Sequence, residues 1–285
     1  MKKFYGFLIA FSISLTSFAQ IAGSWSNAVK TGNGTLNVQY FDNFPFSYHR
    51  SKAELVGIEV DMINEFIRWA KDQKNVTLTS NFIENKDFYT FYDEVKKSSG
   101  DVVGIGSVTI TPSRLGEVNF SAPYLKNKSL LITSVAVPTL STMADATKNF
   151  DSLTAIVVKG SIHEQEVLSL KSKYLPKLKI EYAASPRQVL EKMRTNSRYF
   201  SYIDLVSYWA FVKQPKSKYM KIHRAAISKE EMFGVVFPKN SDWNMAFNEF
   251  MESGLGFASS EAYKEILRKN LGEEIIKTVS VSNIE

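Results

Sequence analysis

The chain has 285 residues, of which 44% are hydrophobic and 22% are charged, and its formal net charge is +6. The length suits one large domain or two modest ones, and the composition is that of an ordinary globular protein. Cysteine is absent, which excludes disulfides and thiolate metal sites, so a packed core has to stabilise the fold.

The first 19 residues have the pattern of a cleaved secretion signal. A basic start, MKK, precedes the apolar run FYGFLIAFSISL, which is too short to span a bilayer, and small residues precede a predicted cleavage before Gln20. The alternatives are an uncleaved anchor and a buried N-terminal helix. Without residues 1–19, 33 basic and 29 acidic residues give a net charge of +4. We therefore expect an exported, periplasmic protein, and the non-cysteine Gln20 gives no support for a lipid anchor.

The rest of the chain alternates between strand-like and helix-like segments. In its first half, strands are predicted at 35–41, 76–83 and 101–108, and helices at 61–71 and 88–97. The pattern then restarts, with strands predicted at 129–138, 153–160, 177–184 and 199–205 and helices at 161–174 and 186–196. Two further helices, 241–255 and 259–272, are expected to begin at serine caps. This alternation favours an α/β fold with two lobes, each a mostly parallel sheet flanked by helices.

One stretch, GSVTITPSR at 106–114, places Ser107, Thr109 and Arg114 at the end of a predicted strand. Open parallel sheets bind ligands at the carboxyl ends of their strands. An arginine beside hydroxyls is suited to holding a carboxylate, because its planar fork donates two parallel hydrogen bonds. The alternative is an ordinary surface arginine on a helix that begins at Pro112.

Three segments, FPFSY…LVGIEVDMINEF, DVVGIGSVTITPSRLGEVNFSAPY and YIDLVSYWAF, resemble in order and spacing the family 3 extracellular solute-binding proteins. These are the polar amino-acid-binding proteins of ABC importers. The resemblance implies the two-lobed type II periplasmic-binding-protein fold, in which two crossing strands join the lobes and allow them to close over a ligand. It places lobe 1 at 30–124 plus 236–285 and lobe 2 at 128–230, with crossings near 125–127 and 229–235.

The resemblance also implies roles for individual residues. Arg114 matches the family arginine that clamps the ligand α-carboxylate, and Ser107 and Thr109 match the adjacent hydroxyl and backbone contacts. Asp204 matches the acid of the second lobe that receives the α-ammonium. Together they would read a zwitterion, which supplies partners for both buried charges. Asp204 could alternatively cap the helix that follows it.

Two positions depart from the family pattern. Ile162 replaces a threonine that touches the carboxylate, although Ser161 and the N-terminus of its helix could still attract an anion. Asn43 stands where the family has an aromatic residue over the ligand side chain, a role that Tyr40, Phe41 or Phe44 could take instead. The identity of the ligand side chain therefore stays open.

Other kinds of site find little support in the sequence. His49, His163 and His223 are far apart and are expected at the surface, so we predict no metal site, and no cofactor motif or catalytic constellation is present. The scattered lysines have the pattern of a solvated face, so we expect no nucleic-acid partner. Trp243, Phe247 and Phe250 lie at helical spacing and are assigned to the core.

The sequence therefore predicts a monomeric solute-binding protein that takes up an amino acid or a close relative and passes it to an ABC permease in the membrane. The first alternative is an enzyme on the same scaffold, resembling periplasmic cyclohexadienyl dehydratases. Such an enzyme needs a general acid in the cleft, and the sequence does not place Glu84, Asp87 or His163 there. The second alternative is a sensory protein that docks on a membrane signalling receptor.

Overall fold

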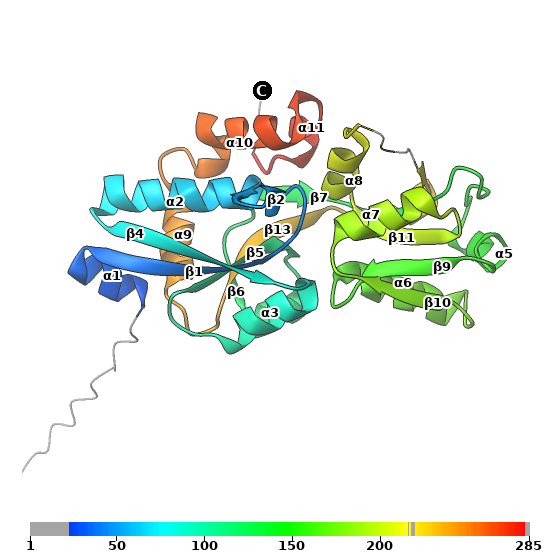
Figure 1. Cartoon of the computed structure of the whole chain (residues 1–285), viewed down its shortest axis with the longest axis horizontal. Coiled ribbons are helices and arrows are strands. Elements are labelled where there is room, and N and C mark those ends of the chain that lie inside the picture. Colours follow the sequence, from blue (N-terminus) through cyan, green and yellow to red (C-terminus); the bar gives the residue numbers. More distant parts are fainter. Residues whose placement is uncertain (1–22, 216, 218–219, 283–285) are drawn as a thin grey trace, which may run out of the picture.

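The computed structural model describes residues 23–215, 217 and 220–282, which form two α/β lobes side by side (Figure 1). The expected signal peptide, residues 1–19, lies outside the described residues. Within the part of the chain that is described, no helix is both long enough and apolar enough to cross a membrane.

The first lobe is built on a mixed sheet with the strand order β4-β1-β5-β13-β6, in which β7 also pairs with β13. Its strands are β1 (Asn33–Phe41), β4 (Thr77–Asn85), β5 (Val102–Thr109), β6 (Asn119–Phe120), β7 (Leu125–Asn127) and β13 (Glu231–Phe237). A small hairpin is formed by β2 (Tyr48–Ser51) and β3 (Glu54–Val56). The helices are α1 (Trp25–Thr31), α2 (Ile58–Lys74), α3 (Phe88–Lys97), α4 (Pro112–Glu117), α9 (Trp243–Glu252), α10 (Glu261–Leu271) and α11 (Glu273–Val279).

The second lobe has a five-stranded sheet with the order β10-β9-β11-β8-β12. Its strands are β8 (Ser129–Thr133), β9 (Thr154–Val158), β10 (Lys179–Ala183), β11 (Tyr199–Asp204) and β12 (Lys221–Ile222). Its helices are α5 (Ala146–Asn149), α6 (Ile162–Lys173), α7 (Pro186–Thr195) and α8 (Leu205–Val212).

Each sheet has the expected parallel part, extended by antiparallel strands. β4, β1 and β5 run parallel, as do β10, β9 and β11. In contrast, β13 pairs antiparallel with β5, and β8 pairs antiparallel with β11. β8 directly follows the first crossing, and β13 forms the second. In both cases the chain enters the sheet from the neighbouring lobe and therefore runs in the opposite direction.

The two connections between the lobes lie side by side. β7 and β13 form an antiparallel pair in which Asn127 faces Glu231 and Leu125 faces Phe233. Figure 1 shows both strands running from the first sheet toward the second lobe. The lobes are also linked by a hydrogen bond from the indole Nε1 of Trp209 in α8 to the carbonyl of Leu271 in α10, 3.0 Å away.

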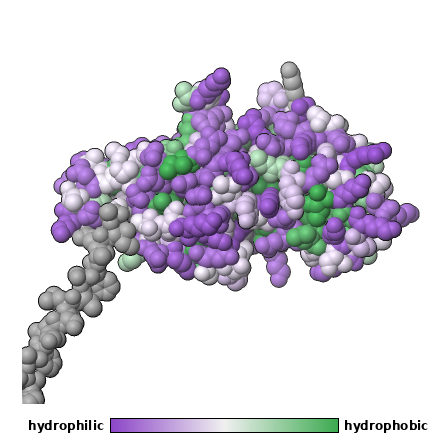
Figure 2. Space-filling view, turned by 60° about the horizontal axis from the view of Figure 1, so that its bottom comes forward, coloured by the Kyte–Doolittle hydropathy of each residue, from purple (hydrophilic) through white to green (hydrophobic). Residues whose placement is uncertain are grey.

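Alternate residues of the strands face different helices, which fixes the layers. In the first lobe, Leu36 and Val38 of β1 pack in one apolar cluster with α2, whereas Phe41 packs with α3 on the opposite face. In the second lobe, Val157 of β9 faces α6 and Val158 faces α7. The side chains around α3 and those around α7 belong to one cluster, so the lobes share apolar contacts. The face in Figure 2 is mainly hydrophilic, with small separate hydrophobic patches.

Helix boundaries follow local capping. α3 covers the predicted range 88–97, and its N-cap Asp87 accepts a hydrogen bond from the Thr90 amide. The serine cap predicted for the last long helix is confirmed, because Ser260 accepts from the amide of Tyr263 at the start of α10. α9 begins later than predicted, at Trp243, with Asp242 at its N-cap position. The carboxylate of Asp242 accepts instead from two amides of α1.

The aromatic stripe of α9 lies in the core, as predicted. Trp243 and Phe247 are each 1% exposed and Phe250 is 3% exposed. They pack with Trp25, Phe66 and Trp69 in the first lobe. These rings hold α1, α2 and α9 together and take no part in the cleft between the lobes.

Candidate functional site

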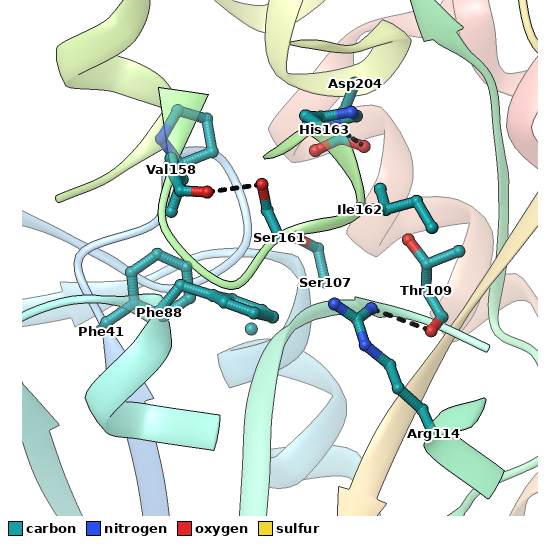
Figure 3. A pocket seen from close by; sticks show the side chains of 12 residues that line it. Phe41, Phe88, Ser107, Thr109, Arg114, Val158, Ser161, Ile162, His163 and Asp204 are labelled. Atoms are coloured by element: carbon teal, nitrogen blue, oxygen red, sulfur yellow. Dashed lines mark hydrogen bonds and ion pairs between the residues drawn. The ribbon is translucent and has the colours of Figure 1, made fainter. Parts of the chain in front are cut away.

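A small cavity lies between the two lobes and is lined by residues of both (Figure 3). Its volume is about 30 Å³, which is room for a water molecule but too little for an amino acid. A ligand of that size can therefore enter only when the lobes separate. The lining residues are Phe41, Phe88, Gly106, Ser107, Thr109 and Arg114 from the first lobe and Val158, Ser161, Ile162, His163, Pro186 and Asp204 from the second.

Arg114 lies in the first turn of α4 and points into the cavity (Figure 3). Thr111 caps this helix by accepting from the Arg114 amide, and Pro112 occupies its first turn. The side chain of Arg114 is only 7% exposed, so it is not the surface arginine of the alternative interpretation. Burial lowers the pKa of Arg114, but a guanidinium stays charged in proteins.

The guanidinium of Arg114 is held from several sides. It donates to the carbonyl oxygen of Thr109 at 3.1 Å and, across the cleft, to that of Gly160 at 3.3 Å. The rings of Phe88 and Tyr92 each lie 5.4 Å from its central carbon. A guanidinium that is fixed in this way has N–H groups left to donate to a ligand carboxylate.

Ser107 contributes its side chain to the cavity wall, while its amide is directed elsewhere. It has a positive φ of 47°, unusual for a residue other than glycine. Its N–H donates to both carboxylate oxygens of Glu59 at 3.1 Å, and its hydroxyl accepts from Asn43 at 2.9 Å. The amide is therefore used inside lobe 1, and only the hydroxyl group is left to contact a ligand.

The carboxylate of Glu59 holds the backbone at Ser107 in place. It is completely buried and accepts a further hydrogen bond from the Tyr124 hydroxyl at 2.8 Å. Burial raises the pKa of Glu59 to about 7, although the hydrogen bonds from Tyr124 and Ser107 act in the opposite direction. The backbone conformation at Ser107 in the cavity wall is thus coupled to the protonation of the Glu59 carboxyl group.

Asp204 reaches the cavity from the second lobe, at the end of β11. It is 5% exposed, and its Oδ1 accepts from Asn127 at 2.8 Å. Asp204 occupies the N-cap position of α8, but its side chain makes no hydrogen bond to that helix. The alternative in which Asp204 serves as a helix cap therefore does not hold.

His163 lines the cavity, although the sequence did not single it out as a site residue. The expectation that the histidines lie at the surface is wrong for two of them, since His163 is 5% exposed and His223 is fully buried. The Nε2 of His163 lies 3.3 Å from Asp204, and its Nδ1 lies 3.0 Å from Glu166. The i,i+3 spacing of His163 and Glu166 on a helix was a usable signal, whereas the contact with Asp204 was not visible in the sequence.

Ser161 lines the cavity and caps α6. Its Oγ accepts from the Glu164 amide at 3.3 Å and donates to the Val158 carbonyl at 2.6 Å, so its single proton is already used (Figure 3). The Glu164 carboxylate reaches back to the amide of Gly160, one residue before the cap. Ile162 presents an apolar side chain to the cavity, where the resemblance would have a hydroxyl.

The aromatic lining differs in part from the expected one. Phe41 and Phe88 line the cavity, with their ring centres 5.7 Å apart. Tyr40 and Phe44 are not among the lining residues. The hydroxyl of Tyr40 contacts His49 at 3.1 Å, and the ring of Phe44 packs on Tyr48. Phe88 was not identified from the sequence, because its contact with the second lobe depends on how the two lobes meet.

The lobes also touch at the rim of the cleft. The guanidinium of Arg187 in α7 lies 5.1 Å from the ring of Phe44, and the ammonium of Lys159 lies 4.6 Å from the ring of Tyr89. Together with the hydrogen bond from Arg114 to Gly160, these contacts describe a largely closed cleft. Among the described residues, no group of three or more histidines and acids is arranged to hold a metal ion.

Solved structures share this architecture over almost their full length. A substrate-binding protein of an ABC uptake transporter from Streptococcus pneumoniae, solved with histidine, is 16% identical, with a TM-score of 0.68, 89% of this chain covered and 98% of that one. The arginine-, lysine- and histidine-binding protein ArtJ from Geobacillus stearothermophilus is 18% identical, with a TM-score of 0.65 and coverages of 85% and 98%. The ancestral amino acid-binding protein AncCDT-1, a precursor of cyclohexadienyl dehydratase, is 18% identical, with a TM-score of 0.63 and coverages of 86% and 98%.

At these identities the structural similarities establish the fold, which is that of the two-lobed type II periplasmic binding proteins. No curated protein sequence matches the chain. The model of the bacterial extracellular solute-binding proteins, family 3, matches residues 37–273 and so spans both lobes and every residue that lines the cavity. The chain belongs to this family of solute-binding proteins.

Proposed function

We propose that this solute-binding protein captures a small zwitterion, an amino acid or a close relative, between its lobes and delivers it to the permease of an ABC importer. The observation that carries the proposal is that Arg114 and Asp204 come from opposite lobes and line the same cavity. A carboxylate at Arg114 and a polar or cationic group at Asp204 would hold the lobes together through one ligand.

The connection between the lobes supports capture by closure. Only β7 and β13 pass between the sheets in the described structure, and a two-stranded connection allows hinge motion. The cavity is too small for an amino acid in the closed form, so binding has to begin with open lobes. Closure then removes the buried charges from water, which strengthens their interaction with a ligand of complementary charge.

The similarity to structures of proteins that bind histidine, or arginine, lysine and histidine, supports an amino-acid-like ligand. The S. pneumoniae protein is the substrate-binding protein of an ABC uptake transporter, which supports delivery of the ligand to a permease. We expect the same use here, with the closed pair of lobes as the form that the permease recognises.

The similarity to AncCDT-1 keeps a dehydratase as the second candidate. Of the three acids considered from the sequence, only His163 lines the cavity. Burial acts to lower the pKa of His163, but Asp204 and Glu166 outweigh burial and raise it to about 10. Such a group is a weak proton donor near neutral pH, where a catalytic acid works best with a pKa near 7. This property favours binding over catalysis.

A ligand screen tests the proposal directly. Because a ligand of the folded state raises the unfolding temperature by mass action, the purified mature protein can be screened against amino acids and related small acids by thermal shift. Calorimetry then gives the affinity of each hit. Saturable binding of a small carboxylate supports the proposal. Turnover of prephenate or arogenate, or a complete lack of binding by folded protein, would contradict it.

A further inference from the structure

The charged groups around the cavity balance one another. The imidazole of His163 lies 3.0 Å from Oε2 of Glu166 and 3.3 Å from Oδ1 of Asp204, so it is held as an imidazolium, in agreement with its raised pKa. Glu231 is a further acid nearby, and its burial raises its pKa, which lowers its negative charge. The two cations, Arg114 and His163, thus meet at least two negative charges. A ligand with a net negative charge gains nothing from this set, whereas a zwitterion without further charge leaves it balanced.

One side of the cavity can bind the two charges of a zwitterion. In Figure 3, Arg114, Thr109, Asp204 and His163 lie on this side. Arg114 has N–H groups left for a carboxylate. The hydrogen bond from Asn127 and the contact with His163 both use Oδ1 of Asp204, which leaves Oδ2 to accept from an ammonium group. The side chain of the ligand then has to lie against the rest of the lining.

The opposite side of the cavity is apolar. Figure 3 shows Phe41, Phe88 and Val158 there, and all three belong to one apolar cluster with residues from both lobes. They are 2%, 5% and 5% exposed, and the two phenylalanine ring centres lie 5.7 Å apart. Pro186 of the second lobe also lines the cavity. None of these four side chains has a group that can form a hydrogen bond with a ligand.

Two hydroxyl groups of the lining are already engaged. Oγ of Ser161 donates to the carbonyl of Val158 at 2.6 Å and accepts from the amide of Glu164 at 3.3 Å. Oγ of Ser107 accepts from Nδ2 of Asn43 at 2.9 Å, and its hydrogen is left for the carboxylate of the ligand. A polar side chain of a ligand would therefore lose its water on the apolar side without gaining a partner, which lowers its affinity.

We propose that this site selects zwitterions with an uncharged, apolar side chain, of the kind that valine, leucine and methionine carry. This inference rests on the proposed function and narrows its ligand class. The side chain packs against Phe41 and Phe88 from the first lobe and against Val158 and Pro186 from the second. Closure of the lobes removes it from water on both sides, so its burial stabilises the closed form together with the charge pairs.

Pairs of amino acids with nearly the same shape separate polarity from size. Valine and threonine, leucine and asparagine, and methionine and glutamine are such pairs. Calorimetry on the mature protein at neutral pH, with these six compounds and with glutamate and lysine, is the decisive measurement. In any pair that binds, we expect the apolar member to bind at least about fivefold more tightly, because the polar member buries a group without a partner.

The variant Val158→Thr tests the assigned place of the ligand side chain. It keeps the shape of the side chain and adds a hydroxyl group to the apolar side, where a polar ligand would then find a partner. We expect the preference for the apolar member of a pair to fall by about fivefold. Val135→Thr is the matched control, because Val135 is 57% exposed in the same lobe, and it should leave the preference unchanged. Circular dichroism checks that both variants are folded.

The outcomes separate the two proposals. Equal or tighter binding of the polar members, or tighter binding of glutamate or lysine than of methionine, would overturn the apolar selectivity and leave the solute-binding proposal standing. This comparison uses the unaltered protein, so it decides even if Val158→Thr fails to fold. An unchanged preference in folded Val158→Thr would also overturn the inference, because the ligand side chain would then not lie against Val158. If no amino acid or small acid binds the folded protein, both proposals fall together.

Discussion

Nδ2 of Asn127 in the hinge strand β7 lies 2.8 Å from Oδ1 of Asp204 and 3.3 Å from Oε2 of Glu231 in the other hinge strand. The acid that lines the cavity is therefore hydrogen-bonded to the connection between the lobes. Asn127 is 2% exposed, so no solvent replaces its amide if it is removed. A change of charge at Asp204 can reach the hinge through this one side chain.

Substitution Asn127→Ala should weaken both the fold and ligand binding. It leaves the buried carboxylate of Asp204 and the half-buried carboxylate of Glu231 without their common donor, a loss that we expect to lower the free energy of unfolding by about 1 to 3 kcal/mol. Urea denaturation with and without ligand measures both effects. Lys128→Ala, at the next and exposed position, is the control and should change neither. Unchanged stability of Asn127→Ala would show that the hydrogen bond contributes nothing net.

Substitution Arg114→Met should remove binding while the protein stays folded. Methionine keeps much of the packing against Phe88 and Tyr92 but cannot hold a carboxylate. Truncating one partner of a buried charge pair costs about 2 to 5 kcal/mol, so we expect a loss of affinity of about thirtyfold or more. Calorimetry measures the affinity, and circular dichroism checks the fold. Arg68→Met, on the exposed side of α2, is the matched control. Retained affinity in Arg114→Met would show that Arg114 does not bind the ligand carboxylate.

The protonation of Glu59 makes stability depend on pH in a direction that can be stated. Its pKa is about 7 in the folded protein against an ordinary value of 4.5. The folded state therefore binds this proton more tightly than the unfolded state does. The resulting contribution to the free energy of unfolding is fully present below about pH 4.5 and is lost as the pH rises through 7. The full difference amounts to about 3 kcal/mol.

The variant Glu59→Gln isolates this contribution, since its amide oxygen can still accept from Ser107 or Tyr124. Urea unfolding of both proteins at pH 5 and pH 8 gives the comparison. The loss of stability from pH 5 to pH 8 should be smaller in the variant, because the titrating group is gone, whereas all other groups are shared. An identical pH dependence in the two proteins would mean that Glu59 has the same pKa folded and unfolded.

Much of the fold could be predicted from the sequence because local signals determine it. The bounds of α3 and the cap of α6 at Ser161 follow from residues three or four positions apart. The position of Arg114 followed from the end of a predicted strand together with the TPSR turn. All of these signals act over short stretches of chain, where periodicity and capping are most informative.

The remainder depends on contacts between distant segments. The pairing of His163 with Asp204 joins residues 41 positions apart, and the donation from Ser107 to Glu59 spans 48. No helical or strand period connects such positions, so the contact of His163 with Asp204 and the hydrogen bond of the Ser107 amide could not be predicted. The antiparallel strands could not be predicted for the same reason, since the direction of β13 is set by the crossing from the other lobe.

Substitution Arg187→Ala should destabilise the closed form of the cleft. Arg187 in the second lobe lies over the ring of Phe44 in the first, and its charge partly offsets the burial that raises the pKa of Asp42. An exposed cation–π contact contributes about 0.5 to 1 kcal/mol, so we expect a two- to fivefold faster release of ligand, roughly as that energy implies. Stopped-flow fluorescence measures the release rate. Arg194→Ala serves as the control, because Arg194 lies on the same helix and pairs with Glu191 within it. An unchanged release rate in Arg187→Ala would show that the rim contact does not hold the lobes closed.

The departure at Ile162 can be reversed by substitution. Ile162 lines the cavity in the first turn of α6, close to the guanidinium of Arg114 (Figure 3). Ile162→Thr adds a hydroxyl that can donate to a carboxylate held by Arg114, and one such hydrogen bond contributes about 1 kcal/mol, which is about fivefold in affinity. Ile162→Val, which has the same shape as threonine without the hydroxyl, is the control. If the threonine and valine variants bind a common ligand equally, its carboxylate does not lie beside position 162, and the ligand is held by lobe 1 alone at this end.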